Sequence, residues 1–347
     1  MALLGGSRSS NCRYWRSSPG CGRVSREGQR NSLPEPSPAP SSEEQVAAGA
    51  LPPMSDGATS SPLTEPLLAR CTFPAHGTSV SLAISGGPDS MALLLLAHAA
   101  GLDITAIHVD HQLRPDSSRD ADIIRTVTEP LGIPLVVHTV HVGDGPNLEA
   151  RARTARYAVF PGEIMTGHTE DDQAETVLIN LLRGAGAQGL SAMRPGHTRP
   201  LLRVRRDETR SLCSSLNITT VDDLTNADPR FLRNRVRNEL LPLMSDLSQR
   251  DPAPLLARTA DVLRADNDLL DELARGLDPT DAKALAAAPT PLAHRALRQW
   301  LSDPYPPDLA TLERILSVAR GDVLACDIGE NRQIRRSKQR LTLHILG

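Results

Sequence analysis

One stretch of this chain decides its fold: Ser85-Gly86-Gly87-Pro88-Asp89-Ser90, hereafter the glycine loop. An apolar run over residues 80–84 precedes it, and a second over residues 91–97 follows it, which predicts a buried strand, a turn and a helix. Glycines allow a sharp turn and a close approach to a ligand, and the helix directs its free N–H groups at the turn. We therefore predict that these six residues bind a phosphate or pyrophosphate, with the Asp89 carboxylate beside a Mg²⁺ ion.

Two common phosphate-binding loops are excluded by the residues around the glycines. No Lys follows them, as a Gly-x-x-x-x-Gly-Lys-Ser/Thr loop requires, and the pattern Gly-x-Gly-x-x-Gly is missing. An ordinary strand-to-helix turn with a serine cap is the alternative. It explains a bare Gly-Gly well, but the complete string in this setting much less well.

The composition sets broad limits. A chain of 347 residues is long enough for two or more domains, and its net charge of -3 does not indicate a nucleic-acid partner by itself. The five cysteines are scattered without a Cys-x-x-Cys pair, which disfavours a zinc site and suits the reducing cytoplasm. No apolar run approaches ~18 residues, so no transmembrane helix is expected.

Residues 1–70 are rich in Ser, Pro and Arg and poor in apolar periodicity, so we expect a disordered tail. The Arg- and Ser-rich beginning superficially suits an organellar transit peptide. We favour a flexible tail, or a start assigned too early with Met54 as the alternative start.

Residues 71–245 alternate between strand and helix patterns. Strands are predicted over 80–84, 104–109, 135–140 and 164–166, with helices over 90–100, 118–131, 148–160 and 171–183. This alternation favours an α/β domain with a parallel sheet covered by helices on both faces. Such sheets bind ligands at the carboxyl ends of their strands, so Ser85 and His168 should face one crevice.

Residues 246–347 form a second, α-rich domain in this interpretation. Helices are predicted over 240–243, 255–263, 269–277, 292–301 and 309–319, and Pro252 and Pro254 mark a join. Strand-like alternation over 322–328 and 341–346 predicts a C-terminal hairpin.

The second strong signal is the segment 165–176, which places His168 just before a helix with Asp171, Asp172 and Glu175. Acidic side chains in a first turn stabilise a helix, so a well-capped helix is the structural alternative. Three acids beside a histidine exceed what capping needs. We predict that a carboxylate here holds the second side of Mg²⁺·ATP and that His168 orients a substrate or moves a proton.

Several basic segments are weaker candidates. Arg153 and Arg156 share one helix face and suit phosphate recognition, or they form a solvated charged face. The loop 109–115 directly follows a strand and is a candidate substrate loop. The arginine-dense runs 230–237 and 332–340 could neutralise a nucleic-acid backbone, although solubility is the usual meaning of such charge.

The glycine loop resembles the pyrophosphate loop of the ATP pyrophosphatase (PP-loop) superfamily. Taken in order, the segments 85–90, 109–115, 149–157, 166–186, 199–202 and 226–242 resemble the tRNA(Ile)-lysidine synthase family. The resemblance is dense over about residues 78–245 and looser beyond. It implies an α/β fold: a Rossmann-like parallel sheet in the PP-loop ATPase domain, followed by a smaller α-rich substrate-binding domain.

The family implies a cytoplasmic, two-step ligase. The wobble cytidine of a tRNA(Ile) with a CAU anticodon attacks the α-phosphate of ATP, and free L-lysine then displaces AMP to form lysidine. The resemblance places Arg156, His168 and Asp172 in the catalytic centre and gives Mg²⁺ to Asp89 and Asp172. The oligomeric state stays open, with a homodimer among the alternatives.

Two departures and two alternatives accompany this interpretation. Pro88 fills a variable loop position, and Pro161-Gly162 shortens the segment after Tyr157, which is expected to shift Arg156 relative to His168. One alternative is another PP-loop enzyme, a tRNA thiolase or an amide-forming synthetase, which would use a sulfur donor or ammonia in place of lysine. The other is a tRNA-binding protein without turnover.

Overall fold

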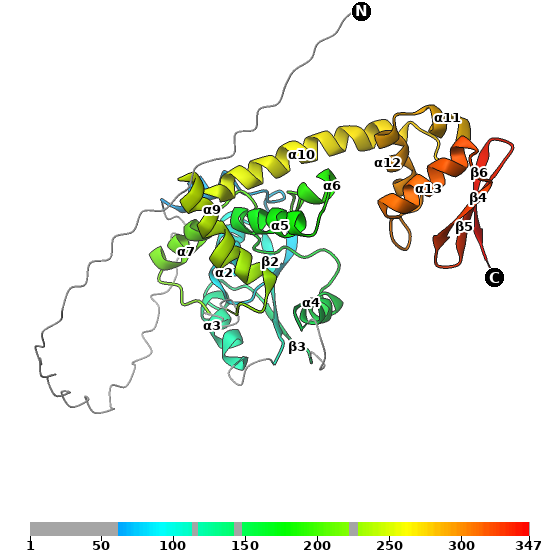
Figure 1. The fold of residues 1–347 in the computed structure, drawn as a ribbon. Helices are drawn as coiled ribbons and strands as arrows, with labels where there is room; N and C mark the ends of the chain where they lie inside the picture. Colours follow the sequence, from blue (N-terminus) through cyan, green and yellow to red (C-terminus); the bar gives the residue numbers. More distant parts are fainter. Residues whose placement is uncertain (1–61, 113–116, 142–147, 222–227, 347) are drawn as a thin grey trace, which may run out of the picture. The chain divides into compact units, whose positions relative to one another are not determined.

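The computed structural model describes residues 62–112, 117–141, 148–221 and 228–346 (Figure 1). Most of the expected tail therefore lies outside the described residues, as do parts of the segments 109–115 and 226–242. The end of the expected tail instead forms helix α1, Thr64–Leu68, because Leu67 is buried in the first hydrophobic core.

The first sheet is parallel, as predicted. Its strands are β1 (Ser79–Ala83), β2 (Asp103–Asp110) and β3 (Leu135–Thr139), in the order β1-β2-β3. The predicted fourth strand is reduced to a single parallel bridge between Met165 and Leu82. Met165 exchanges 2.9 Å backbone hydrogen bonds with Ser81 and Ala83, so this segment still extends the sheet beyond β1.

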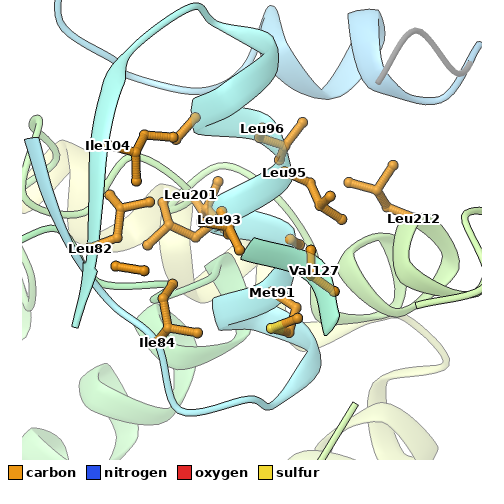
Figure 2. Packing of buried hydrophobic residues seen from close by; sticks show 14 of the residues in the cluster. Leu82, Ile84, Met91, Leu93, Leu95, Leu96, Ile104, Val127, Leu201 and Leu212 are labelled. Atoms are coloured by element: carbon orange, nitrogen blue, oxygen red, sulfur yellow. The ribbon is translucent and has the colours of Figure 1, made fainter. Parts of the chain in front are cut away.

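Helix α2, Pro88–Ala99, is the centre of the first core. Every residue from Ser90 to Ala97 is buried, as expected of a helix that is apolar all round. Figure 2 shows why: strand residues Leu82 and Ile104 pack on one side of α2, and Leu212 of α7 packs on the other. This burial on all sides fixes the start of α2, and with it the glycine loop.

The first three of the remaining helices of this domain lie where helices were predicted, at 118–131, 148–160 and 171–183, and the others follow without a described strand between them. They are α3 (Ser118–Thr128), α4 (Leu148–Val159), α5 (Glu170–Leu182), α6 (Ala187–Leu190), α7 (Arg206–Ser215), α8 (Leu232–Arg235), the π-helix η2 (Val236–Leu240) and α9 (Leu241–Ser248). The expected domain limit at residue 245 falls within α9, and the domain limits themselves stay predictions.

One long helix, α10 (Pro252–Arg275), replaces the two helices predicted after Pro252 and Pro254. The prolines do not interrupt it, because they lie in the first turn, where no intrahelical N–H is needed. The Asp251 carboxylate caps the helix by accepting the Ala253 N–H at 3.0 Å. Its buried face packs on α5 and α6.

A second hydrophobic core joins α11 (Ala282–Ala287), α12 (Thr290–Trp300) and α13 (Leu309–Arg320) to a small sheet. This sheet has three antiparallel strands, β4 (Ala325–Gly329), β5 (Arg332–Ser337) and β6 (Arg340–Ile345), and not the predicted hairpin. The extra strand β5 lies in the basic run 332–340, whose charges hid its alternation. None of the described helices is long and apolar enough to cross a membrane.

Candidate active site

The glycine loop turns the chain from β1 into α2. Gly86 has a φ of 83°, and a Cβ at this position would lie 2.5 Å from Cγ2 of Val221, so both its conformation and its space require glycine. Gly87 is the N-cap of α2, and Pro88 at the first helical position has no N–H to leave unpaired. The N–H groups of the first turn have no intrahelical acceptor and are available to an anion.

The two serines of the loop have different roles. The Ser90 hydroxyl donates to the Gly87 carbonyl at 2.9 Å and accepts the Ser85 N–H at 3.2 Å. Ser90 is therefore used to close the loop on itself, whereas the Ser85 side chain lies next to it, with 3.2 Å between the hydroxyl oxygens.

Gly167 brings the second predicted segment onto this loop. A Cβ on Gly167 would lie 2.7 Å from the Asp89 carbonyl oxygen and 3.1 Å from the Ser90 nitrogen. Only glycine lets the two backbones pass this closely. The residue that follows, His168, is thereby held beside the start of α2.

The burial of His168 favours its neutral imidazole form. The Thr166 hydroxyl donates to the Thr198 carbonyl at 3.2 Å, so it accepts the proton of His168 Nδ1, which lies 2.7 Å away. Burial lowers the pKa of His168 to about 4. The negative charge of Asp172 opposes this shift, and the positive charge of Arg233 adds to it. Nε2 therefore carries a lone pair that can accept a hydrogen bond throughout the neutral pH range.

Asp172 is held in its ionised form. Its Oδ2 accepts both the backbone N–H and the hydroxyl of Thr169 at 2.9 Å, which anchors the start of α5. Its Oδ1 accepts from Nη2 of Arg206, also at 2.9 Å. Burial alone would raise the pKa of Asp172, but the charges of Arg206 and Arg233 lower it to about 2.

Asp89 faces Asp172 across the Arg206 side chain. The Thr209 hydroxyl donates to one Asp89 oxygen, and Nε of Arg206 lies 3.5 Å from the other. Burial raises the pKa of Asp89, the Thr209 hydrogen bond opposes this rise, and the nearby Asp172 charge adds to it. The two carboxylates predicted to hold Mg²⁺ are thus close together, and one guanidinium bridges them.

Glu175 forms the buried centre of an ionic cluster. Its side chain has 0% exposure, and three guanidinium groups surround it: Arg206 at 3.0 Å, Arg233 at 2.9 Å and Arg237 at 2.7 Å. These arginines come from α7, α8 and η2, so the cluster ties three elements to α5. Sequence reasoning missed Arg206 because its partners lie more than thirty positions earlier and no local pattern links them.

The basic run 230–237 is therefore not a uniform RNA-facing surface. The buried Glu175 pairs with Arg233 and Arg237, so part of their charge is neutralised within the protein, and their contact with RNA stays a prediction. Arg235 pairs with Glu239 at 3.0 Å on the surface. The C-terminal run on β5 and β6 stays a prediction.

Arg156 lies on α4 without a carboxylate partner in the described chain. Its Nε donates to Nε2 of His111 at 3.3 Å, and burial together with the nearby Arg153 lowers the pKa of Arg156. Arg153 stacks over the Tyr157 ring, 4.8 Å from its centroid. An arginine without an acidic partner is suited to an anionic ligand.

A pocket of about 420 Å³ brings most of the predicted site together. The predicted residues that line it are Ser85, Asp89, Ser90, Arg156, His168 and Asp172. The other three residues of the predicted loop, Gly86, Gly87 and Pro88, are not among those that line the pocket. Although α4 ends at Val159, the shortened segment after it still leaves Arg156 and His168 on the same pocket.

His108 also lines this pocket and was not predicted. It is only 3% exposed, and its Nδ1 donates to the Ile84 carbonyl at 2.9 Å. Its Nε2 is buried without a hydrogen-bond partner. From the sequence alone, a histidine inside a predicted strand is interpreted as a core residue. Only the structure shows that Nε2 of His108 is an acceptor at the pocket.

Among the described residues, Cys71, Cys213 and Cys326 are free, and no group of three or more His, Cys, Asp or Glu side chains is arranged to hold a metal. A metal bound to Asp89 and Asp172 would need other ligands besides.

Two family models match the chain: a PP-loop domain over residues 63–244 and a TilS substrate binding domain over residues 281–342. A tRNA(Ile)-lysidine synthase of Mycolicibacterium paratuberculosis is 43% identical over 235 residues, which cover 63% of this chain and 73% of that protein. One of Nocardia farcinica is 40% identical over 270 residues, covering 72% and 85%. Among solved structures, a U34-tRNA thiolase of Methanococcus maripaludis aligns with a TM-score of 0.46 and 16% identity, over 58% of this chain and 78% of that one. On the two family models and these relatives, the chain belongs to the tRNA(Ile)-lysidine synthase family.

Proposed function

We propose that this protein uses ATP to activate the wobble cytidine of a tRNA(Ile) with a CAU anticodon and then joins free L-lysine to its 2-position. The observation that carries this function is one pocket in which the glycine loop faces His168 and Asp172. Family membership supplies the reaction: the cytidine 2-oxygen attacks the α-phosphorus and pyrophosphate leaves, then the lysine ε-amine attacks carbon 2 and AMP leaves.

The glycine loop is suited to the leaving pyrophosphate. Helix α2 directs unpaired N–H groups and its positive end at the loop, and these donors are already oriented before ATP binds. Charge that develops on the leaving group is then stabilised without reorganisation of the protein, which is where such donors contribute most.

Mg²⁺ fits the two carboxylates by their chemistry, since this ion prefers oxygen ligands and accepts one or two carboxylates together with substrate phosphates. Asp89 and Asp172 would hold it, and the ion supplies charge neutralisation for the departing pyrophosphate. Arg206 now occupies both carboxylates. Binding the ion therefore requires Asp89 and Asp172 to exchange part of their contact with Arg206.

The pKa values separate the roles of the catalytic candidates. With a pKa of about 2, Asp172 is a poor proton acceptor, and we assign it to holding positive charge and orienting the α5 start. His168 offers the Nε2 lone pair and orients a donor group of the substrate. Arg156 stabilises negative charge on the phosphate of the adenylated cytidine. Cytoplasmic location and a homodimer stay predictions.

The decisive experiment incubates the protein with ATP, radiolabelled lysine and tRNA(Ile), and measures label in the RNA and pyrophosphate release. We expect label in the RNA only when all three substrates are present, whereas pyrophosphate release requires ATP and the tRNA and should turn over repeatedly only when lysine is also present. The same tRNA with uridine at the wobble position is the control and should accept no lysine. Incorporation of nitrogen from ammonia, or of sulfur from a sulfur donor, into the tRNA in place of lysine would overturn the proposal.

A variant tests the site. Asp172→Ala should abolish AMP formation and leave tRNA binding largely intact, because the proposed role of Asp172 lies in the ATP pocket. Undiminished turnover by this variant would remove Asp172 from the mechanism.

A further inference from the structure

Helix α10 carries an apolar stripe on the side opposite its packed face. Four large apolar side chains of this helix are 47–57% exposed: Leu255, Val262, Leu269 and Leu273. They recur at intervals of seven, seven and four residues, which at about 100° per residue keeps them on one side of the helix. The residues that α10 buries, such as Ala260 and Arg264, lie on the other side. The stripe is therefore part of neither hydrophobic core.

The stripe has the dimensions of a surface for a second helix. From Leu255 to Leu273 it extends about 27 Å along the helix axis. Three half-buried leucines widen one edge of it at the same seven-residue interval: Leu256, Leu263 and Leu270. Apolar side chains that repeat every seven residues form the seam between two packed helices. A straight, narrow stripe of this kind fits a helix better than it fits a compact ligand.

The exposed charges of α10 indicate which helix fits. Arg258 lies beside the N-terminal half of the stripe, whereas Asp266 and Glu272 lie in the C-terminal half. Within the described ranges, none of the three has an ion-pair partner. A parallel copy of α10 would place like charges next to each other, but an antiparallel copy places the arginine of each helix against acids of the other. The stripe is thus complementary to itself about a two-fold axis.

We propose that two copies of this chain associate through antiparallel pairing of α10, with the two-fold axis at Val262. Leu255 and Leu269 are equally far from Val262 along the chain, so Leu255 of each copy lies opposite the partner's Leu269. Arg258 and Asp266 are also equally far from it, so Arg258 lies opposite the partner's Asp266. Both the apolar contacts and the charges are therefore satisfied in a single register.

The expected dimer is weak. One pair of helices of this length buries less surface than the ~1,600 Å² of a standard interface, so we expect a Kd on the order of micromolar. The pairing makes no use of the reaction proposed above, so either proposal can fail without the other.

Sedimentation velocity of the full chain, between about 1 and 100 μM, measures the association. We expect the average mass to rise from that of a monomer towards that of a dimer. Val262→Glu places two carboxylates at the axis and should raise the Kd at least about a hundredfold. Leu324→Lys is the matched control, because it adds a charge at a leucine that is 78% exposed outside α10, and it should leave the Kd unchanged. Far-UV circular dichroism checks that both variants fold.

Charge reversal tests the antiparallel register. Arg258→Asp brings acids of the two copies together and should raise the Kd about tenfold. Combining Arg258→Asp with Asp266→Arg exchanges the two charges and should restore the wild-type Kd. Val262→Cys gives a second measurement, because a cysteine on the axis can form a disulfide with its own copy under mild oxidation. The wild-type chain, which has five cysteines of its own, provides the background.

Four outcomes would overturn the proposal. The chain could stay monomeric throughout this concentration range, or a dimer could form that Val262→Glu does not weaken. Failure of the double charge reversal to restore association would exclude the antiparallel register. If the chain is monomeric and Val262→Glu instead weakens the binding of tRNA(Ile) in a filter assay, the stripe is an RNA contact.

Discussion

Replacing Glu175 by glutamine should destabilise the first domain more than any other isosteric change of a carboxylate in the described chain. Glutamine keeps the shape of the side chain and one acceptor oxygen. It removes the negative charge that the three guanidinium groups share, and it places an NH₂ donor against their N–H donors. Removing one partner from a buried ion pair costs about 3–5 kcal/mol. The arginines are 13–28% exposed, so water relieves part of this penalty and we expect the lower end, about 3 kcal/mol.

A loss of this size changes the folding equilibrium roughly a hundredfold and lowers Tm by roughly 6–12 °C for a domain of this length. Urea unfolding followed by far-UV circular dichroism measures it, and the slope m should stay constant. Trp300 lies in α12 and packs against the second core, so the fluorescence of Trp300 reports whether the second core unfolds together with the first.

Glu239→Gln is the control, because this carboxylate is 54% exposed and makes a helix-surface pair with Arg235. It should cost at most about 0.5 kcal/mol. If the two substitutions cost the same, the cluster around Glu175 contributes no more than a surface ion pair, and the reasoning that it ties α7, α8 and η2 to α5 fails.

Three further predictions concern the site. Gly167→Ala should cost about 1–3 kcal/mol and most of the activity, because its Cβ would meet the Asp89 backbone, whereas Gly186→Ala, with open space around it, should be neutral in both unfolding and turnover assays. The pKa of His168 is about 4 in the folded protein and 6.5 in the unfolded chain, so the unfolded chain binds the proton more readily between these pH values. The free energy of unfolding should therefore fall by up to about 3 kcal/mol as the pH drops from 6.5 to 4. His168→Gln should flatten this part of the stability profile measured by urea unfolding. The folded pKa of Asp172 is about 2 against 3.8, so it contributes about 2 kcal/mol above pH 4 that disappears towards pH 2; Asp172→Asn should remove that acid limb, and an unchanged limb would contradict the assigned ion pairing.

The local elements of the first domain could be predicted because their causes are local. The apolar run before and after the glycine loop dictates β1 and α2, and acids after His168 mark the start of α5. The segment around Met165 is shorter as a strand than predicted, since the two apolar residues Ile164 and Met165 do not specify how many sheet partners the segment will find.

The ionic network could not be predicted, because charge patterns do not reveal partners. From the sequence, Arg233 and Arg237 are interpreted as charges that face solvent or RNA. The structure shows that both also pair with the buried Glu175. The orphaned acceptor of His108 was equally hidden, because it arises from a contact between two adjacent strands' ends. The glycine loop, by contrast, could be predicted, because its glycines and the helix that follows determine its conformation locally.

The π-helix η2 determines how this region responds to the insertion or deletion of a residue. Helices α8, η2 and α9 follow one another without a break, and the i→i+5 hydrogen bonding of η2 accommodates one extra residue between α8 and α9. Deleting one residue within 236–240 would therefore restore an ordinary helix and leave the faces on either side of it nearly in place, whereas a deletion in the regular helix α9 would rotate everything beyond it by about 100°. A one-residue deletion in 236–240 should thus be tolerated better than one in α9, and homologous chains can be compared there by spacing as well as by residue identity.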